Sequence, residues 1–174
     1  MRIPDTIGIG KDEDEIEIKP EYEYAAVALI TRNNKVIIEK RSVMAGDPWS
    51  GQFSLPGGHL SKHDALLKET AIRETLEETG VNLNEVGRYL GHFGPFVPKN
   101  KQNLRVYAYA FVLQKPVQLV PSKESEFLMW LDLSKVRATE GEHGNEFRFS
   151  KGTIWGLTAR ILEKFLELCE ADTE

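Results

Sequence analysis

The chain has 174 residues, with 22 lysines and arginines against 27 aspartates and glutamates, which gives a formal charge of −5 at pH 7. Its 41% hydrophobic and 28% charged residues exclude a disordered or fibrous protein, and its length suits one globular domain with a buried core. The acidic balance argues against charge-driven binding of nucleic acid, which requires clustered Lys and Arg. As a bulk number, it also argues against ligands that contain phosphate.

The sequence also bears on cellular location. No run of about 18 apolar residues is present, so we predict no membrane span. The first 20 residues lack the basic end and the apolar stretch of a signal peptide. The single cysteine, Cys169, excludes an intrachain disulfide framework and suits a reducing compartment. We therefore expect a cytoplasmic protein that binds neither membranes nor nucleic acid.

Residues 1–20 differ in composition from the rest and predict an acidic N-terminal arm. Residues 11–15 are a charge run typical of a solvated segment, and the alternation at 16–18 allows a short edge strand. No internal repeat or flexible linker follows, so residues 21–174 are expected to form one domain.

Two apolar runs, 24–30 and 36–38, flank an Asn-Asn pair. Asparagine tolerates positive φ, so these runs predict two strands joined by a turn at Asn33-Asn34. Residues 43–59 are rich in Gly, Pro, Trp and Ser and predict a long structured loop, with a short strand at 53–55.

A helix is predicted at 61–79. Ser61 is placed to cap its first turn, Asp64 stands at the capping-box position three residues later, and Gly80 follows the last turn. The positions expected to face the core are Ala65, Ile72 and Leu76.

The remaining elements alternate between strands and helix. Strands are expected at 81–97 and 104–113, with a further strand or turn at 127–133. Residues 153–169 predict an amphipathic helix, because their apolar residues recur on one face. The mixed order indicates an α/β or α+β fold with one core.

The helix at 61–79 carries the sequence Arg73-Glu74-Thr75-Leu76-Glu77-Glu78-Thr79-Gly80. Helical geometry places Glu74, Glu77 and Glu78 in a sector about 100° wide. Three hard oxygen donors on one face suit Mg²⁺, although the same pattern also describes a solvated acidic face. The upstream Gly-Gly pair lets the backbone approach a ligand, which favours the metal interpretation.

The stretch from Gly58 to Val81 resembles the Nudix box, G-x5-E-x7-R-E-U-x-E-E-x-G-U, where U is a bulky apolar residue. The resemblance implies an α/β/α sandwich with a central mixed sheet, in which the box forms a loop–helix–loop. It also implies hydrolysis of a nucleoside diphosphate linked to another group, with Mg²⁺ or Mn²⁺ as cofactor.

Carried over residue by residue, the resemblance makes Glu74 and Glu78 metal ligands and the carbonyl of Gly58 a further ligand. Glu77 would be a ligand or the group that activates water. Arg73 would act in catalysis by pairing with a carboxylate and fixing its orientation.

Two positions depart from the family pattern. One extra residue lies between Gly58 and Arg73, so that Asp64 falls where the first Glu of the box is expected, and its supporting role is open. Thr75 stands at an apolar position. Neither change affects the R-E-x-x-E-E core.

The segments flanking the box resemble the coenzyme A diphosphatase-like branch of the family. The matching segments are Lys40-Arg41-Ser42, Trp49-Ser50-Gly51-Gln52, Leu55-Pro56-Gly57-Gly58 and Ile154-Trp155-Gly156-Leu157-Thr158. The substrate implied is coenzyme A or a derivative. ADP-ribose or another nucleotide sugar remains an alternative, and so does a non-catalytic ligand-sensing domain, which the complete carboxylate motif disfavours.

Three residues upstream of the box are candidates for substrate binding. Arg41 can bind phosphate with its guanidinium fork, or it is an ordinary surface arginine. Trp49 and Phe53 can stack on an adenine, or they anchor the loop.

The sequence likewise leaves several candidates for the catalytic base. A carboxylate has to reach the attacking water, and the candidates are Glu77 and the loop residues Glu124 and Glu126. The bound cation would supply the positive charge toward the diphosphate that the composition lacks. Dimers are common in this family, so a homodimer is also allowed.

Overall fold

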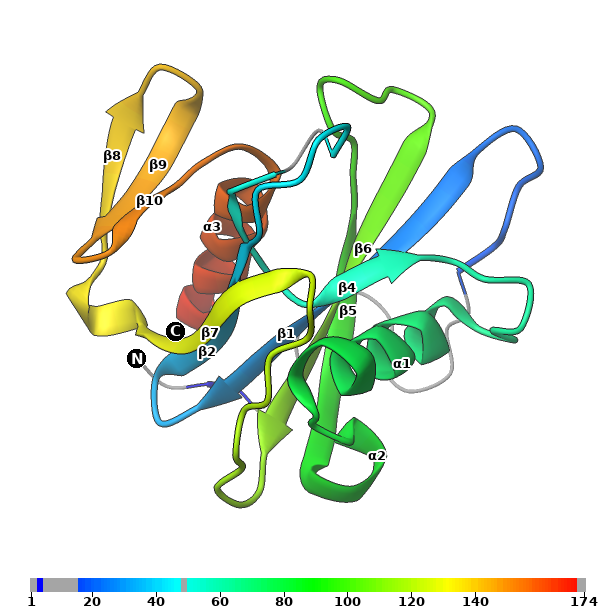
Figure 1. Cartoon of the computed structure of the whole chain (residues 1–174), viewed down its shortest axis with the longest axis horizontal. Helices are drawn as coiled ribbons and strands as arrows, with labels where there is room; N and C mark the ends of the chain where they lie inside the picture. Colours follow the sequence, from blue (N-terminus) through cyan, green and yellow to red (C-terminus); the bar gives the residue numbers. More distant parts are fainter. Residues whose placement is uncertain (1–2, 5–15, 48–49, 172–174) are drawn as a thin grey trace.

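The structure, a computed structural model, describes residues 3–4, 16–47 and 50–171, and shows a large mixed sheet between helices with a small second sheet at one side (Figure 1). The strands are β1 Glu23–Arg32, β2 Lys35–Arg41, β3 Phe53–Ser54, β4 Gly57–His59, β5 Gly87–Phe96, β6 Leu104–Leu113, β7 Ser125–Asp132, β8 Arg137–Gly141, β9 Gly144–Phe149 and β10 Gly152–Ile154. The helices are α1 Leu67–Thr79, α2 Leu83–Val86 and α3 Gly156–Ala171, with a 3₁₀ turn, η1, at Leu133–Lys135. None of the helices in these described ranges is long and apolar enough to cross a bilayer.

The main sheet has the strand order β3-β2-β1-β6-β5, with β4 also paired to β1 and β7 to β2. The β1–β6 pair is parallel and the other pairs are antiparallel, which confirms the mixed sheet. Strands β8, β9 and β10 form the separate antiparallel sheet.

Strands β1 and β2 separate soon after their turn, and this separation creates room for the site. Asn33 and Asn34 have φ of 52° and 62°, which confirms the predicted turn. Beyond it, β2 pairs with β3 while β1 pairs with β4. The chain around Gly57 therefore lies against β1, so closely that a Cβ there would sit 2.3 Å from the carbonyl oxygen of Ala26. Only glycine fits this position.

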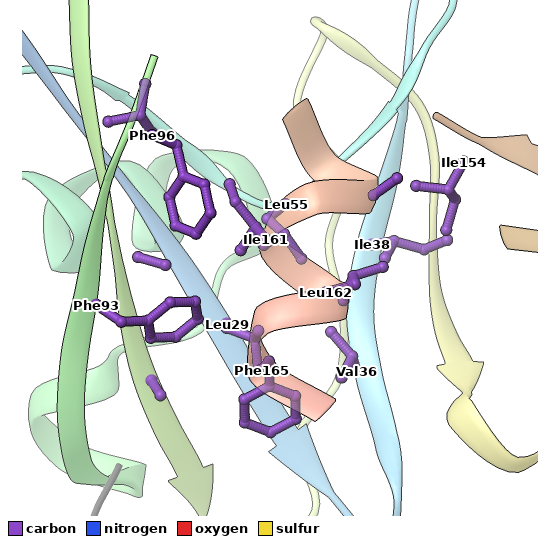
Figure 2. Close-up of a cluster of buried hydrophobic side chains, with 14 of the residues drawn as sticks. Leu29, Val36, Ile38, Leu55, Phe93, Phe96, Ile154, Ile161, Leu162 and Phe165 are labelled. Carbon is purple, nitrogen blue, oxygen red and sulfur yellow. The ribbon is translucent and has the colours of Figure 1, made fainter. Parts of the chain in front are cut away.

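Two hydrophobic clusters cover the two faces of the main sheet. Side chains alternate along β1, so Leu29 belongs to the cluster under α3, whereas Ile30 belongs to the cluster under α1. Figure 2 shows the α3 cluster, in which Leu29 lies beside Leu162 and Phe165 of the helix. Two helical layers on a mixed sheet confirm the α/β/α sandwich.

Helix α1 begins later than predicted, at Leu67 instead of residue 61, and no side chain caps it. The NH of Asp64 donates to the carbonyl of Ser61 at 3.0 Å, and the NH of Ser61 donates to Asp64 Oδ2 at 3.1 Å. The expected capping pair thus closes a separate turn before the helix. The helix ends at Thr79 and is followed by the capping Gly80, with φ of 76°, as predicted.

The buried face of α1 agrees with the prediction only at Ile72, which is partly buried against the hydrophobic cluster on the α1 side of the sheet. Leu76 is 48% exposed, and Ala65 is exposed in the loop before the helix. The buried positions are Leu67, Thr70, Ala71, Thr75, Glu78 and Thr79. The apolar periodicity misled here because the helix turns its acidic side toward β4.

The ends of the chain show smaller differences. Residues 16–18 form no strand, and the hydroxyl of Tyr24 holds this segment by bonding to the NH of Lys19 and the carbonyl of Glu17. Helix α3 begins at Gly156, three residues after the predicted start, because Gly152–Ile154 is strand β10. The division into an arm, 1–20, and a domain, 21–174, stays a prediction.

Candidate active site

A cavity of about 1220 Å³ opens where β4, α1 and the start of α3 meet. It gathers most of the predicted site residues in its wall: Arg41, Gly58, Arg73, Glu74, Glu77, Glu78 and Glu124. These residues come from β2, β4, α1 and the loop before β7, so the sandwich brings four separate segments together.

The glycine pair of β4 contacts the acidic face of α1 directly. A Cβ on Gly58 would lie 2.5 Å from Oε1 of Glu74, so only glycine lets this carboxylate approach the backbone. The NH of Gly57 donates to Glu78 Oε2 at 2.9 Å. The close approach therefore places two carboxylates of α1 against the peptide groups of one short strand.

Arg73 organises the other side of this face. Its Nε and Nη2 donate to the two carboxylate oxygens of Asp64 at 3.0 and 2.9 Å. Its Nη1 donates to Glu74 Oε1 at 2.9 Å and lies 3.5 Å from Glu77. The bonds from Arg73 are the main reason why the pKa of Asp64 falls to about 2. Asp64 thus acts as the anchor of Arg73.

Glu39, on β2, is a buried carboxylate that sequence reasoning missed. It is 2% exposed and accepts hydrogen bonds from Ser54 Oγ at 3.0 Å and Ser125 Oγ at 2.7 Å. Burial raises its pKa, and these two hydroxyls oppose the rise. The signal in the sequence was a single acid directly after the apolar run 36–38.

Glu78 is likewise buried, and burial is the main reason why its pKa is raised to about 9. The nearby charges of Glu39 and Glu74 add to this rise, while the NH of Gly57 opposes it. Buried carboxylates that repel one another are favoured in their charged form only when a cation neutralises them.

The donor chemistry of this face fits Mg²⁺ or Mn²⁺. Carboxylate and carbonyl oxygens are the ligands that these hard cations prefer, and Gly58, Glu74, Glu77 and Glu78 supply them. In the described part of the chain, no group of three Asp, Glu, His or Cys side chains lies close enough together to hold an ion. Arg73 donates to Glu74 Oε1 and lies 3.5 Å from Glu77, so the other oxygen of Glu74 is the one that a cation can use while Arg73 stays in place.

Arg41 lies in the cavity wall with its guanidinium partly committed. Its Nη2 and Nε donate to Asp47 Oδ2 at 2.9 and 3.3 Å, and its Nη1 lies 3.8 Å from Glu39. Burial lowers its pKa, but the bond with Asp47 raises the value above normal, so Arg41 remains a cation. Its predicted binding to phosphate stays a prediction.

Two predicted residues within the described ranges, Phe53 and Glu126, do not join the cavity wall. Phe53 is only 6% exposed and makes edge-to-face contacts with Phe127 and Phe149, so stacking on a base is a wrong prediction for this buried ring. Glu126 is exposed and does not line the cavity, since alternation along β7 turns it away from Ser125. Trp49 lies outside the described residues.

Several lining residues were not singled out as site residues from the sequence. They lie in the β8–β9 turn, at the start of β9, directly before α3 and in its first turns: His143, Asn145, Trp155 and Arg160. Only tertiary packing brings these segments beside α1, although 154–158 had already matched the coenzyme A diphosphatase-like branch.

Comparison with known proteins shows which family the chain resembles over most of its length. The family model described as NUDIX domain matches residues 21–150. "Nudix hydrolase 22, chloroplastic" from Arabidopsis thaliana is 31% identical over 147 residues, covering 74% of this chain and 47% of that protein. "Peroxisomal coenzyme A diphosphatase ndx-8" from Caenorhabditis elegans is 32% identical over 87 residues, covering 49% of this chain and 36% of that protein. The chain thus spans less than half the length of these curated relatives.

The fold has close counterparts among solved structures. A bifunctional NMN adenylyltransferase/ADP ribose pyrophosphatase from Francisella tularensis gives a TM-score of 0.62 at 19% identity, covering 88% of this chain and 43% of that one. A MutT NUDIX hydrolase from Burkholderia pseudomallei gives 0.55 at 19% identity, covering 84% and 96%. Identities this low show the fold alone. Since the family model covers most of the chain, and the box residues meet in one cavity, the chain belongs to the NUDIX domain family.

Proposed function

We propose that this chain is a hydrolase that uses Mg²⁺ or Mn²⁺ to cleave the pyrophosphate bond of a nucleoside-diphosphate-linked substrate. The observation that carries the proposal is the contact of Glu74 and Glu78 with the Gly57-Gly58 backbone inside a large cavity. Carboxylates held against a glycine step suit a cation and a phosphate group, whereas a solvated acidic face does not require this contact.

The proposed substrate is coenzyme A or one of its derivatives. The support is the similarity to a protein named as a coenzyme A diphosphatase and the matching sequence segments around the box. The cavity, at about 1220 Å³, exceeds the 300–1000 Å³ common for small-ligand pockets and suits a long substrate with a nucleotide at one end.

A bound Mg²⁺ would neutralise the pyrophosphate oxygens and lower the pKa of the attacking water. The protein positions the reactants: Arg41 faces the same cavity as the carboxylates and can pair with a phosphate oxygen. Arg73, held by Asp64, keeps Glu74 in place.

Hydrolysis requires one proton acceptor. As water oxygen bonds to phosphorus, the bond to the bridging oxygen breaks and its electron pair leaves with the second phosphate. A carboxylate takes the proton from the water. Glu124 and Glu77 both line the cavity, and Glu124 is close enough to raise the pKa of Glu39 and Glu74. We favour Glu124 because Glu77 lies beside Arg73.

A substrate panel tests the proposal directly. Coenzyme A, ADP-ribose, NADH, dinucleoside polyphosphates and nucleoside triphosphates are incubated with the protein and Mg²⁺ or Mn²⁺, and the products are read by mass spectrometry. We expect coenzyme A to give a phosphopantetheine and adenosine 3′,5′-bisphosphate.

The panel separates the alternatives. Turnover of ADP-ribose without turnover of coenzyme A contradicts coenzyme A as the substrate but still supports hydrolysis of a pyrophosphate bond. No turnover of any compound with either metal contradicts the enzyme and favours a ligand-sensing domain. The cytoplasmic location and the homodimer stay predictions.

A further inference from the structure

The cavity has a second wall that the proposed chemistry does not use. It is formed by the turn between β8 and β9, the β5–β6 loop and the segment that enters α3. Figure 1 shows the small sheet and α3 on the opposite side of the main sheet from α1. The two walls thus belong to different layers of the sandwich.

Trp155 is the most unusual residue of this wall. Its side chain is 36% exposed and lines the cavity, although a large ring exposed to water is unfavourable. The backbone on both sides is fixed: Ile154 is fully buried and paired with Phe147, and Gly156 begins α3 with φ of 67°. The fold therefore holds an indole ring in place at the cavity surface.

His143 supports this ring from a second segment. Its imidazole stacks on the indole with ring centres 4.5 Å apart and planes inclined by 29°. His143 comes from the turn between β8 and β9, so the small sheet contributes to the placement of Trp155. A flat ring backed by another flat ring loses little conformational entropy when a third ring stacks on it.

The rest of the described cavity wall offers no comparable surface. Among the described lining residues, Trp155 is the only Phe, Tyr or Trp, and the apolar floor is aliphatic: Ala25, Val27, Leu104, Val106 and Ile161. A nucleoside-diphosphate-linked substrate carries a flat base, and every type of nucleobase can stack on an aromatic ring.

We propose that Trp155, backed by His143, is the platform on which the base of the nucleoside stacks while the diphosphate lies at the acidic face of α1. The inference rests on the proposed function for the identity of the ligand. It assigns to Trp155 the stacking role that the sequence suggested for Trp49 and Phe53.

The test compares ligands that share a diphosphate and differ in the base. Calorimetric titrations with ADP and with inorganic pyrophosphate, both with Mg²⁺, are run on the wild type, Trp155→Leu and Trp155→Phe. We expect Trp155→Leu to weaken ADP binding by about 10- to 100-fold, the range typical of one lost base stack, and to leave pyrophosphate binding unchanged. Trp155→Phe keeps an aromatic face and should retain most of the ADP affinity.

Trp130→Phe is the matched control. Trp130 lies in β7, packs against the α1-side hydrophobic cluster and does not line the cavity, so neither affinity should change. His143→Ala, which removes only the backing ring, should weaken ADP binding by less than Trp155→Leu does. With coenzyme A as substrate, Trp155→Leu should raise KM by a similar factor with kcat nearly unchanged.

Three results would overturn the inference. Unchanged ADP affinity in Trp155→Leu excludes stacking, and equal weakening of ADP and pyrophosphate shows a general structural role. Loss of ADP binding in Trp49→Leu but not in Trp155→Leu places the base on the other loop. Because the titrations need no turnover, they decide the platform even where the substrate panel contradicts the proposed reaction.

Discussion

At the scale of single residues, Glu39 connects the candidate base to the acidic face. Ser125, which donates to Glu39 Oε2 at 2.7 Å, directly follows Glu124, and the NH of Ser42 donates to the Glu124 carbonyl at 2.9 Å. Glu39 is thus positioned to fix the first residues of β7. Its own side chain does not line the cavity, so any effect of Glu39 on catalysis is indirect, and the bond to Ser125 gives it a route to Glu124.

This arrangement predicts that Glu39→Gln lowers kcat by about 10-fold with little change in KM, the size common for residues that orient a reactive group. Glutamine keeps the volume but accepts through only one oxygen, so the position of Glu124 loosens. The decisive measurement is a double-mutant cycle with Glu124→Gln. If Glu124 is the base, Glu39→Gln should add little to Glu124→Gln, and fully additive losses would contradict the coupling.

At the scale of elements, the loop before α1 shows how one sequence pattern serves two structures. Ser61 and Asp64 have the spacing of a capping box, and a turn between two residues three apart uses the same backbone donors. The structure has the turn instead of the helix cap, because Asp64 also accepts two hydrogen bonds from Arg73. The sequence could not reveal this choice, since Arg73 lies nine residues further along.

Asp64→Asn is expected to lower stability by about 1–2 kcal/mol at pH 7, because the amide loses the charge-assisted pair with partly exposed Arg73. The folded pKa of Asp64 is lowered to about 2, so its contribution is present above the unfolded pKa and is lost as pH falls toward 2. Urea unfolding should give a constant difference between mutant and wild type from about pH 5 to 8. The difference should shrink below about pH 4, and a constant difference throughout would contradict the assignment.

Elements formed by long apolar runs were predictable from the sequence, and short polar ones were not. The runs around Leu29 and Phe111 alternate sides of a sheet buried on both faces, so their type is unambiguous. Strands β8, β9 and β10 are short and glycine-punctuated, and their residues gain burial mainly by packing on α3 and β3. Only the tertiary structure makes them strands.

At the scale of the whole molecule, the sequence located one half of the cavity and missed the other. The carboxylates of α1 are local in sequence, so helical spacing alone placed them together. Which aromatic ring faces the cavity depends on distant packing: Phe53 is buried between Phe127 and Phe149, whereas Trp155 stacks on His143 at the cavity surface. The residue types alone do not indicate which of the two rings is buried and which faces the cavity.

The net charge of −5 acquires a different meaning once the acids are placed. Glu39, Glu74 and Glu78 are buried or partly buried near one another, and burial raises the pKa of each. A cluster of this kind opposes folding when it is charged and without a cation. The metal-free protein should therefore be less stable than its core alone would make it.

The loss of stability caused by these buried carboxylates can be measured. Between the unfolded pKa of 4.5 and the folded value of about 9 for Glu78, the folded state binds more protons than the unfolded state, so metal-free stability falls as pH rises. Glu78→Gln should abolish turnover by removing a ligand charge, yet raise metal-free stability at pH 8.5 by at least about 1 kcal/mol, or about 2–4 °C in Tm. Thermal melts in EDTA at pH 5 and 8.5 check this, with the mutant's gain in Tm expected only at the higher pH.

Excess Mg²⁺ should raise the Tm of the wild type more than that of the mutant, because binding to the folded state stabilises it. A stability difference between wild type and mutant that is the same at both pH values would contradict the raised pKa of Glu78. Wild-type turnover of the mutant at saturating Mg²⁺ would show that Glu78 is not a metal ligand.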